Sequence, residues 1–285
     1  DFDMTLEIES VDGTIKEDIS IKHNDIFNDK YVNENTLVRS FELCPLDLDN
    51  DQLIPKRIIQ TMDNNKVSLQ HLKTVQTLKE LNPEYEYVFY NASDRRLFIK
   101  THFDSDVLDT YDGLLYGAFK ADIFRYCYLY INGGCYIDCK MIGRTPLRNI
   151  ITSTLKSGIC IDRINNAFQN NVILTVPKNP IMKSCIKLCV ERFKNKIHIK
   201  QNFGSLYHTG PFMFYTAIHD MISEDNLIFR YTCAFYERNY RQSKIVGNKD
   251  GVTYFNTFYN KYYENYSEIH NTQNWCTLWE NGLIY

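Results

Sequence analysis

The residues of this chain that are best suited to chemistry lie in the stretch NGGCYIDCK, residues 132–140. Successive side chains of a β-strand point to opposite faces, so Tyr136, Asp138 and Lys140 should share one face of a strand here. An acid followed two residues later by a second acid is typical of a site for a divalent metal and a phosphate group. A lysine stands in the second position, so the sequence predicts such a site with one ligand replaced.

Two further charged residues precede this stretch. Asp122 and Arg125 are three residues apart in the apolar stretch 114–131, and this spacing places them on one side of a helix. Gly133-Gly134 should end the helix, and Asp138 then falls at the carboxyl end of a strand, where ligands of open α/β sheets bind. Two acids and two bases suit a diphosphate and sugar hydroxyl groups. The alternative is a buried ion-pair network that only ties helix to strand.

The elements that must position these residues alternate between strands and helices. The apolar spacing predicts strands at 56–62, 85–91, 135–138, 158–162 and 172–176. It predicts helices at 67–81, 114–131 and 180–196, a helix capped by Ser93, one beginning near 104–106 and one after 209–211. This order indicates an α/β fold with a parallel or mixed sheet and helices on its faces, in one main domain over 53–285. Residues 1–52 are polar and lack sustained periodicity, and should form an extended or irregular N-terminal extension.

Composition and charge exclude several classes of protein. The 285 residues are 44% hydrophobic and carry a net charge of -3, which favours a globular protein and gives no attraction to nucleic acid. Lys120, Asp122 and Arg125 interrupt the longest apolar stretch, so no transmembrane segment is expected. The nine cysteines are an odd number without a CxxC pair, and are expected to be mostly reduced, buried thiols.

The stretch LLYGAFKADIFRYCYLYINGGCYIDCK, residues 114–140, resembles the donor-site signature of the DXD-containing sugar transferases of glycosyltransferase family 32. In that family a helix bearing A-D-x-x-R-Y leads through two glycines to Y-x-D-x-D. The resemblance extends to IPKRIIQTM (54–62), PEYEYVFYN (83–91) and HTGP (208–211). The family includes fungal initiating α-1,6-mannosyltransferases, inositolphosphoceramide mannosyltransferases, bacterial capsule enzymes and members from large DNA viruses.

The resemblance implies a GT-A fold, which is a Rossmann-like mixed sheet flanked by helices in a single catalytic domain. It also implies a retaining hexosyltransferase. Such an enzyme moves a sugar from a UDP- or GDP-linked donor to a hydroxyl group of a glycan, protein or lipid. It implies catalytic roles for Asp122, Arg125, Asp138 and Lys140. The donor site that it implies comprises Ile59, Gln60, Thr61, Asn91, Asp122, Arg125, Tyr136, Asp138, His208, Gly210 and Trp275. The alternative is a catalytically degenerate module that binds a sugar nucleotide or a glycan.

The metal of this family is Mn²⁺ or Mg²⁺, for which the resemblance implies Asp138 and His270 as ligands. Lys140 occupies the place of the last acid of the motif, and an ammonium group cannot bind a hard divalent cation. Three interpretations remain open. Lys140 replaces part of the charge of the metal, or the metal still binds through Asp138, the phosphates and a C-terminal residue, or catalysis is lost.

Two further expectations concern a rival reaction and the location. Glycoside hydrolysis needs one carboxyl group with a raised pKa, whereas Arg125 and Lys140 should keep both Asp122 and Asp138 ionised. The many Asn, Lys, Ile and Tyr residues suggest an AT-rich, viral or low-GC source. A cytoplasmic location in a bacterium or a virus-infected host is favoured, with the Golgi lumen as the alternative.

Overall fold

The computed structural model describes residues 4–9, 16–21, 36–37, 52–162, 167–197, 204–221, 229–232, 245–247 and 253–256. Its main body is a sheet of nine strands in the order β6-β4-β7-β10-β9-β11-β12-β13-β8. These strands are β4 (Arg57–Thr61), β6 (Glu86–Tyr90), β7 (Gly134–Ile137), β8 (Ile142–Gly143), β9 (Ser157–Asp162), β10 (Ala167–Thr175), β11 (Phe229–Thr232), β12 (Ile245–Gly247) and β13 (Thr253–Asn256).

The sheet is mixed. Strand β4 runs parallel to both β6 and β7, and β9 runs parallel to β11. Strand β10 is antiparallel to β7 and β9. The parallel strands are linked through helices, as a crossover between parallel strands requires. The predicted α/β fold with a mixed sheet flanked by helices is therefore confirmed.

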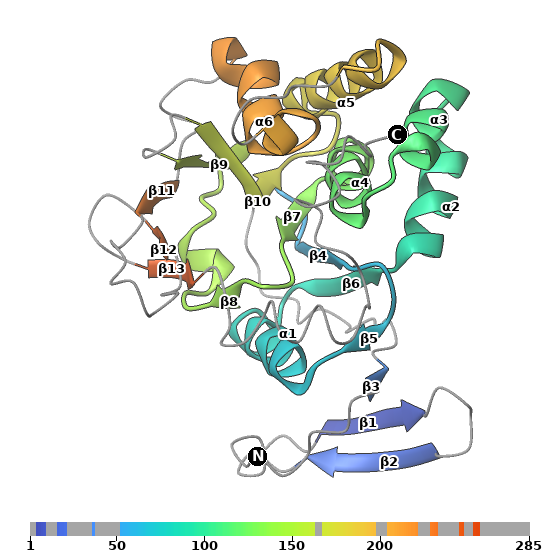
Figure 1. The fold of residues 1–285 in the computed structure, drawn as a ribbon. Helices are drawn as coiled ribbons and strands as arrows, with labels where there is room; N and C mark the ends of the chain where they lie inside the picture. The colour runs from blue at the N-terminus through green and yellow to red at the C-terminus, as the bar shows by residue number, and fades with distance from the viewer. Residues whose placement is uncertain are drawn as a thin grey trace, which may run out of the picture.

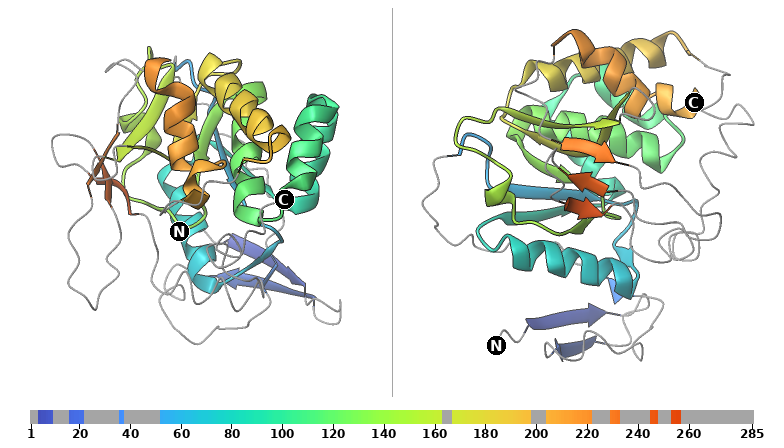
Figure 2. Two further views of the ribbon diagram at one scale, coloured as in Figure 1. Left: turned by 45° about the horizontal axis from the view of Figure 1, so that its top comes forward. Right: turned by 90° about the vertical axis from the view of Figure 1, so that its left-hand side faces the viewer.

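Helices cover both faces of this sheet (Figure 1). They are α1 (Leu69–Leu81), α2 (Ala92–His102), α3 (Ser105–Gly113), α4 (Gly117–Asn132), α5 (Pro180–Lys194) and α6 (Pro211–Ile218). Figure 2 shows α1 beneath the sheet and α4, α5 and α6 above it. Two apolar clusters follow, because alternate strand residues face opposite sides: Ile59 and Tyr136 pack with the upper helices, and Ile58, Cys135 and Ile137 with α1.

Several predicted boundaries shift by a few residues. The Ser68 side chain accepts a hydrogen bond from the His71 amide, so α1 begins two residues later than the periodicity predicts. Ser93 is not the cap of α2. Asn91 takes that role and forms a reciprocal capping box with Asp94, because an asparagine directly after β6 already meets the first unpaired amides.

The N-terminal residues that the structure describes form strands. Strands β1 (Met4–Glu9) and β2 (Lys16–Ile21) form an antiparallel pair. Strand β3 (Thr36–Leu37) pairs with β5 (Lys66–Val67). Figure 1 shows the β1–β2 pair apart from the main sheet. Met4, Leu6 and Ile8 alternate with polar residues in β1, which is the two-residue period of a strand.

The junction between α4 and β7 is made by the glycine pair. Gly133 and Gly134 have φ angles of 65° and 104°, which side chains rarely tolerate. A Cβ on Gly133 would lie 2.7 Å from the Pro177 nitrogen, and one on Gly134 would lie 2.9 Å from the Arg57 carbonyl oxygen. The predicted glycine stop is confirmed, and it brings β7 directly against β4. Within the described residues no helix is both long and apolar enough to cross a membrane.

Candidate active site

Helix α4 contributes the inner half of the site. Asp122 and Arg125 lie on its buried side, and their side chains are 11% and 6% exposed. Arg125 Nη2 lies 2.9 Å from Asp122 Oδ1, and the two residues form an ion pair across one turn of the helix. The guanidinium also covers the Tyr136 ring, with 4.3 Å between Cζ and the ring centroid. The helical spacing therefore brings this acid and base together as predicted.

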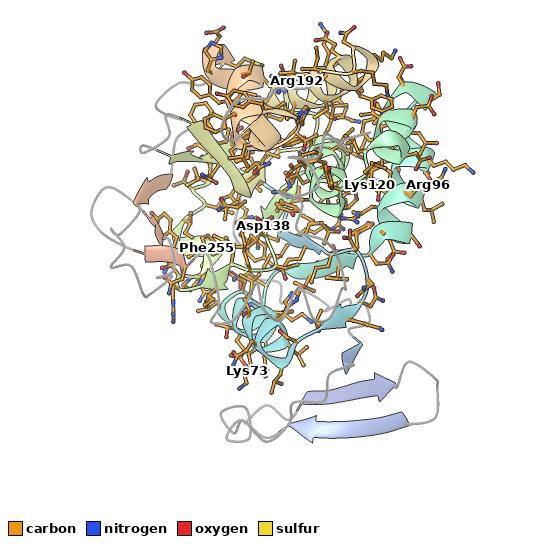
Figure 3. The ribbon with its side chains drawn as sticks, viewed as in Figure 1. Lys73, Arg96, Lys120, Asp138, Arg192 and Phe255 are labelled. Carbon is orange, nitrogen blue, oxygen red and sulfur yellow. The ribbon has the colours of Figure 1, made fainter. Side chains whose placement is uncertain are left out.

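Asp138 joins the strand end to that pair. Its amide donates to the Asn171 carbonyl at 2.8 Å, which continues the pairing of β7 with β10. Arg125 Nη1 lies 3.1 Å from Asp138 Oδ1, and Lys140 Nζ lies 3.1 Å from Oδ2. The Tyr136 hydroxyl donates to Oδ1 at 2.9 Å. Tyr136, Asp138 and Lys140 thus share one side, and Figure 3 shows Asp138 near the middle of the main body.

Sequence reasoning missed the role of Asn170. Its Nδ2 donates to Asp122 Oδ1 and to the Tyr126 hydroxyl, both at 2.9 Å, and its carbonyl accepts from Arg125 Nη1. A bulge in β10 presents it, because β10 advances from Gln169 to Ile173 while β9 advances only from Cys160 to Ile159. The two asparagines in the apolar run of β10 are the sequence signal that could have indicated it.

The loop before α6 closes the network. The Thr209 hydroxyl donates to Asp122 Oδ2 at 2.8 Å, and the Tyr126 hydroxyl donates to the Thr209 carbonyl at 2.8 Å. Tyr126 also stacks on Phe214 of α6, with ring centroids 5.7 Å apart. Both oxygens of Asp122 therefore accept hydrogen bonds, which is the geometry of an ionised carboxylate.

The two carboxyl groups differ in acidity. Burial acts to raise the pKa of Asp138, but Arg125 and Lys140 together outweigh it and hold the pKa below its usual value. Burial also raises the pKa of Asp122, and there Arg125 offsets it only in part, so the pKa lies above its usual value. The cationic neighbours therefore outweigh burial at Asp138, whereas burial outweighs Arg125 at Asp122.

Gln60 supports Asp138 from the opposite face of the sheet. Its Nε2 donates to the Asp138 carbonyl at 3.3 Å, and the buried Tyr87 hydroxyl donates to its Oε1 at 2.7 Å. The thiol of Cys139 donates to the Thr61 carbonyl at 3.3 Å. The Met141 amide donates to the Asp138 carbonyl at 2.9 Å. The end of β7 is therefore held to β4 from below while Arg125 holds it from above.

The other predicted donor-site residues lie at varying distances from this network. Ile59 is fully buried in the upper apolar cluster, and the Thr61 hydroxyl donates to the Tyr90 carbonyl. Asn91 caps α2 at the end of β6, two strands away from β7. His208 is buried, with its ring 5.7 Å from the Phe119 ring.

Gly210 immediately precedes α6. A Cβ there would lie 3.7 Å from Asp122 Oδ2, so the backbone passes close to this carboxylate. Trp275 and His270 lie outside the described residues. The six cysteines that the structure describes are free thiols and buried, as expected.

The donor atoms around Asp138 do not suit a divalent metal. Asp138 Oδ1 already contacts Arg125 and Tyr136, and Oδ2 contacts Lys140. The part of the chain that the structure describes contains no group of three acidic, histidine or cysteine side chains that could hold a metal ion. A cation at Asp138 would face a guanidinium and an ammonium group at close range, so the described residues do not fit Mn²⁺ or Mg²⁺.

This arrangement can bind a polyol and an anion side by side. Asp122 and Asp138 offer carboxylate oxygens to hydroxyl groups, and Arg125 fixes both of them because one guanidinium contacts both. Lys140 is the most accessible member of the group, with its side chain 25% exposed against 16% for Asp138. An anionic ligand would therefore meet the cationic end of the network at Lys140.

Comparisons with known proteins relate part of this chain to glycosyltransferases. Residues 68–156 match the family model described as the glycosyltransferase sugar-binding region containing the DXD motif. The inositol phosphoceramide mannosyltransferase 3 of Schizosaccharomyces pombe is 30% identical over 164 residues, which cover 55% of this chain and 43% of that protein. The initiation-specific alpha-1,6-mannosyltransferase of Candida albicans is 30% identical over 112 residues, which cover 37% of this chain and 29% of that protein.

These matches confirm the resemblance that the motifs indicate. The matched region contains α4, the glycine pair and the end of β7, and hence Asp122, Arg125, Asp138 and Lys140. The aligned part spans less than half the length of either curated relative. Among solved structures, the PaToxG glycosyltransferase is 19% identical with a TM-score of 0.48, over 60% of this chain and 70% of that one.

Proposed function

We propose that this chain, which carries the DXD-type sugar-binding region of glycosyltransferases, transfers a hexose from a nucleoside diphosphate sugar to a hydroxyl group. The acceptor is a glycan, a protein or a lipid. The observation that carries the proposal is the position of Arg125, which holds Asp122 and Asp138 together at the end of β7. A strand end with fixed carboxylates and an accessible cation matches a ligand that is a sugar on one side and a diphosphate on the other.

In the proposed reaction, the bond between the anomeric carbon and the diphosphate oxygen breaks as the acceptor oxygen binds that carbon. The acceptor proton passes to the departing phosphate on the same face of the sugar, which gives retention of configuration. No protein nucleophile is needed. The chain contributes by orienting the donor through Asp122 and Asp138 and by stabilising the negative charge of the leaving group.

A second candidate function is sugar-nucleotide or glycan binding without turnover. The ion pair between Lys140 and Asp138 favours it, because this pair stands where the family has a metal-binding acid. The pKa contrast between Asp122 and Asp138 does not make the site a hydrolase. Asp122 accepts hydrogen bonds at both oxygens from Asn170, Thr209 and Arg125, so it has no proton directed at a leaving group.

The test is a donor screen. Purified protein is incubated with UDP- and GDP-sugars, with simple glycoside and lipid acceptors, in EDTA and in MnCl₂, and the released nucleotide is measured. The relatives are named as mannosyltransferases, so a mannosyl donor is tried first. The anomeric configuration of the product is read by NMR. Binding of a donor without release of nucleotide under any condition would support the binding module instead.

A variant at Arg125 tests whether the reaction requires the network of Asp122, Arg125 and Asp138. Arg125→Lys keeps the charge but loses the fork that contacts two carboxylates, so nucleotide release should fall by about a hundredfold or more. Arg96→Lys is the matched control, because Arg96 pairs with Asp112 in an exposed contact far from the network. Equal rates for wild type and Arg125→Lys would contradict the proposed site.

A further inference from the structure

We propose that Lys140 supplies the positive charge that binds the diphosphate of the donor, so that donor binding by this chain does not require a divalent metal. This inference rests on the proposed function. It starts from the position of the lysine, whose Nζ lies 3.1 Å from Asp138 Oδ2. That oxygen belongs to the acid expected to bind the metal, so the ammonium group occupies the side of Asp138 where a cation would bind.

The second step concerns the competition between cations. Asp138 is held between Arg125 at one oxygen and Lys140 at the other. A divalent ion binds a carboxylate oxygen at about 2.0–2.6 Å and would lie close to both positive groups. Repulsion between like charges in a site this buried is stronger than in water. The carboxylate that would attract the metal is already neutralised by the chain itself.

The third step concerns which cation can reach a ligand. Arg125 directs Nη1 at Asp138 and the Asn170 carbonyl, and Nη2 at Asp122. Its side chain is only 6% exposed, whereas that of Lys140 is 25% exposed. Arg125 therefore orients the carboxylates, and Lys140 is the cation at the accessible end of the network. An ammonium group carries three N–H donors, so it can contact Asp138 and a phosphate oxygen together.

The experiment measures binding rather than turnover. Dissociation constants for GDP and UDP are determined by calorimetry in EDTA and in excess MnCl₂. We expect wild type to bind GDP or UDP. The dissociation constant of the nucleotide that binds should be the same in both buffers, within about twofold. Lys140→Met should weaken binding in both buffers by about tenfold to a hundredfold, as loss of a hydrogen bond to a charged group would.

Lys140→Asp restores the acid of the family motif. It should bind nucleotide poorly in EDTA and recover affinity in MnCl₂, because two neighbouring acids can then share the metal. Lys187→Met and Lys187→Asp are matched controls, since Lys187 is 77% exposed and pairs with Glu191 on α5. Both control variants should bind as wild type does.

The outcomes separate the two proposals. Wild-type binding that MnCl₂ strengthens more than about fivefold would overturn the role of Lys140 and leave the proposed function standing. Unchanged affinity in Lys140→Met would overturn it too. No binding of either nucleotide by wild type in any buffer would overturn the proposed function, and this inference with it. If a Lys140 variant fails to fold by circular dichroism, the comparison of wild type in the two buffers still decides.

Discussion

Replacing Asn170 with aspartate tests whether the β10 bulge holds the candidate site together. The exchange keeps the size and shape of the side chain but removes both Nδ2 donors, which serve Asp122 and Tyr126 at 2.9 Å. It also places a second carboxylate against Asp122 in a region where Asn170 is 5% exposed. The change therefore combines lost hydrogen bonds with a buried repulsion.

The expected penalty follows from these two effects. Two buried hydrogen bonds contribute about 1 kcal/mol each, and a buried unpaired charge costs a further few kcal/mol. The free energy of unfolding should therefore fall by about 3–5 kcal/mol at about pH 7.5. Asn170→Ala loses the hydrogen bonds without the added charge, so it should cost about 2–3 kcal/mol.

The pH dependence has a definite sign. The facing carboxyl groups in Asn170→Asp cannot both ionise, so the pKa of the pair rises above its unfolded value of about 4. The folded variant then binds more protons than the unfolded chain, and its stability increases as the pH falls. The penalty relative to wild type should shrink between about pH 7.5 and about pH 5. Asn170→Ala removes a hydrogen bond that lowers the pKa of Asp122, so it should show the same trend to a smaller extent.

Urea unfolding followed by circular dichroism measures both effects. Asn149→Asp is the control, because Asn149 is exposed, and its effect should stay within about 0.5 kcal/mol. A penalty below about 1 kcal/mol for Asn170→Asp, or one that does not change with pH, would refute the role assigned to the bulge.

Two further predictions concern stability. Gly133→Ala should lower the free energy of unfolding by about 2–4 kcal/mol, because its φ of 65° and the Pro177 nitrogen at 2.7 Å exclude a Cβ; a melting temperature equal to wild type would contradict this. Burial lowers the pKa of Lys79 to about 8, so the folded state gains stability as the pH rises from there toward 10.5. Lys79→Met should therefore stabilise the protein by about 1 kcal/mol near neutral pH, after allowance for the contact with the Tyr87 ring, and the gain in denaturant titrations should vanish above about pH 10.

The sequence predicted the part of the site that depends on local periodicity. The two-residue period of a strand places Asp138 and Lys140 on one side, and the helical period pairs Asp122 with Arg125. The role of the glycine pair was also predictable from a short stretch of chain, because a helix that turns directly into a strand needs positive φ angles. These are properties of short stretches of chain.

Contacts that depend on pairing between distant strands could not be predicted. Asn170 reaches Asp122 only because β10 bulges against β9, and no local pattern encodes that register. The raised pKa of Asp122 has a similar origin, since it reflects burial beneath elements far along the chain. Asn91 and Ser93 are both good capping residues, and only the end of β6 decides between them.

The anchoring of the strand end on both faces has a consequence for the thermodynamics of binding. Gln60 and Cys139 tie it to β4, while Arg125 ties it to α4. Because the carboxylate of Asp138 is already fixed in the free protein, a ligand that uses it does not have to freeze a mobile loop. This segment loses its conformational entropy when the chain folds. Ligand binding therefore does not have to order it, and the affinity for the ligand is higher by the cost that is avoided.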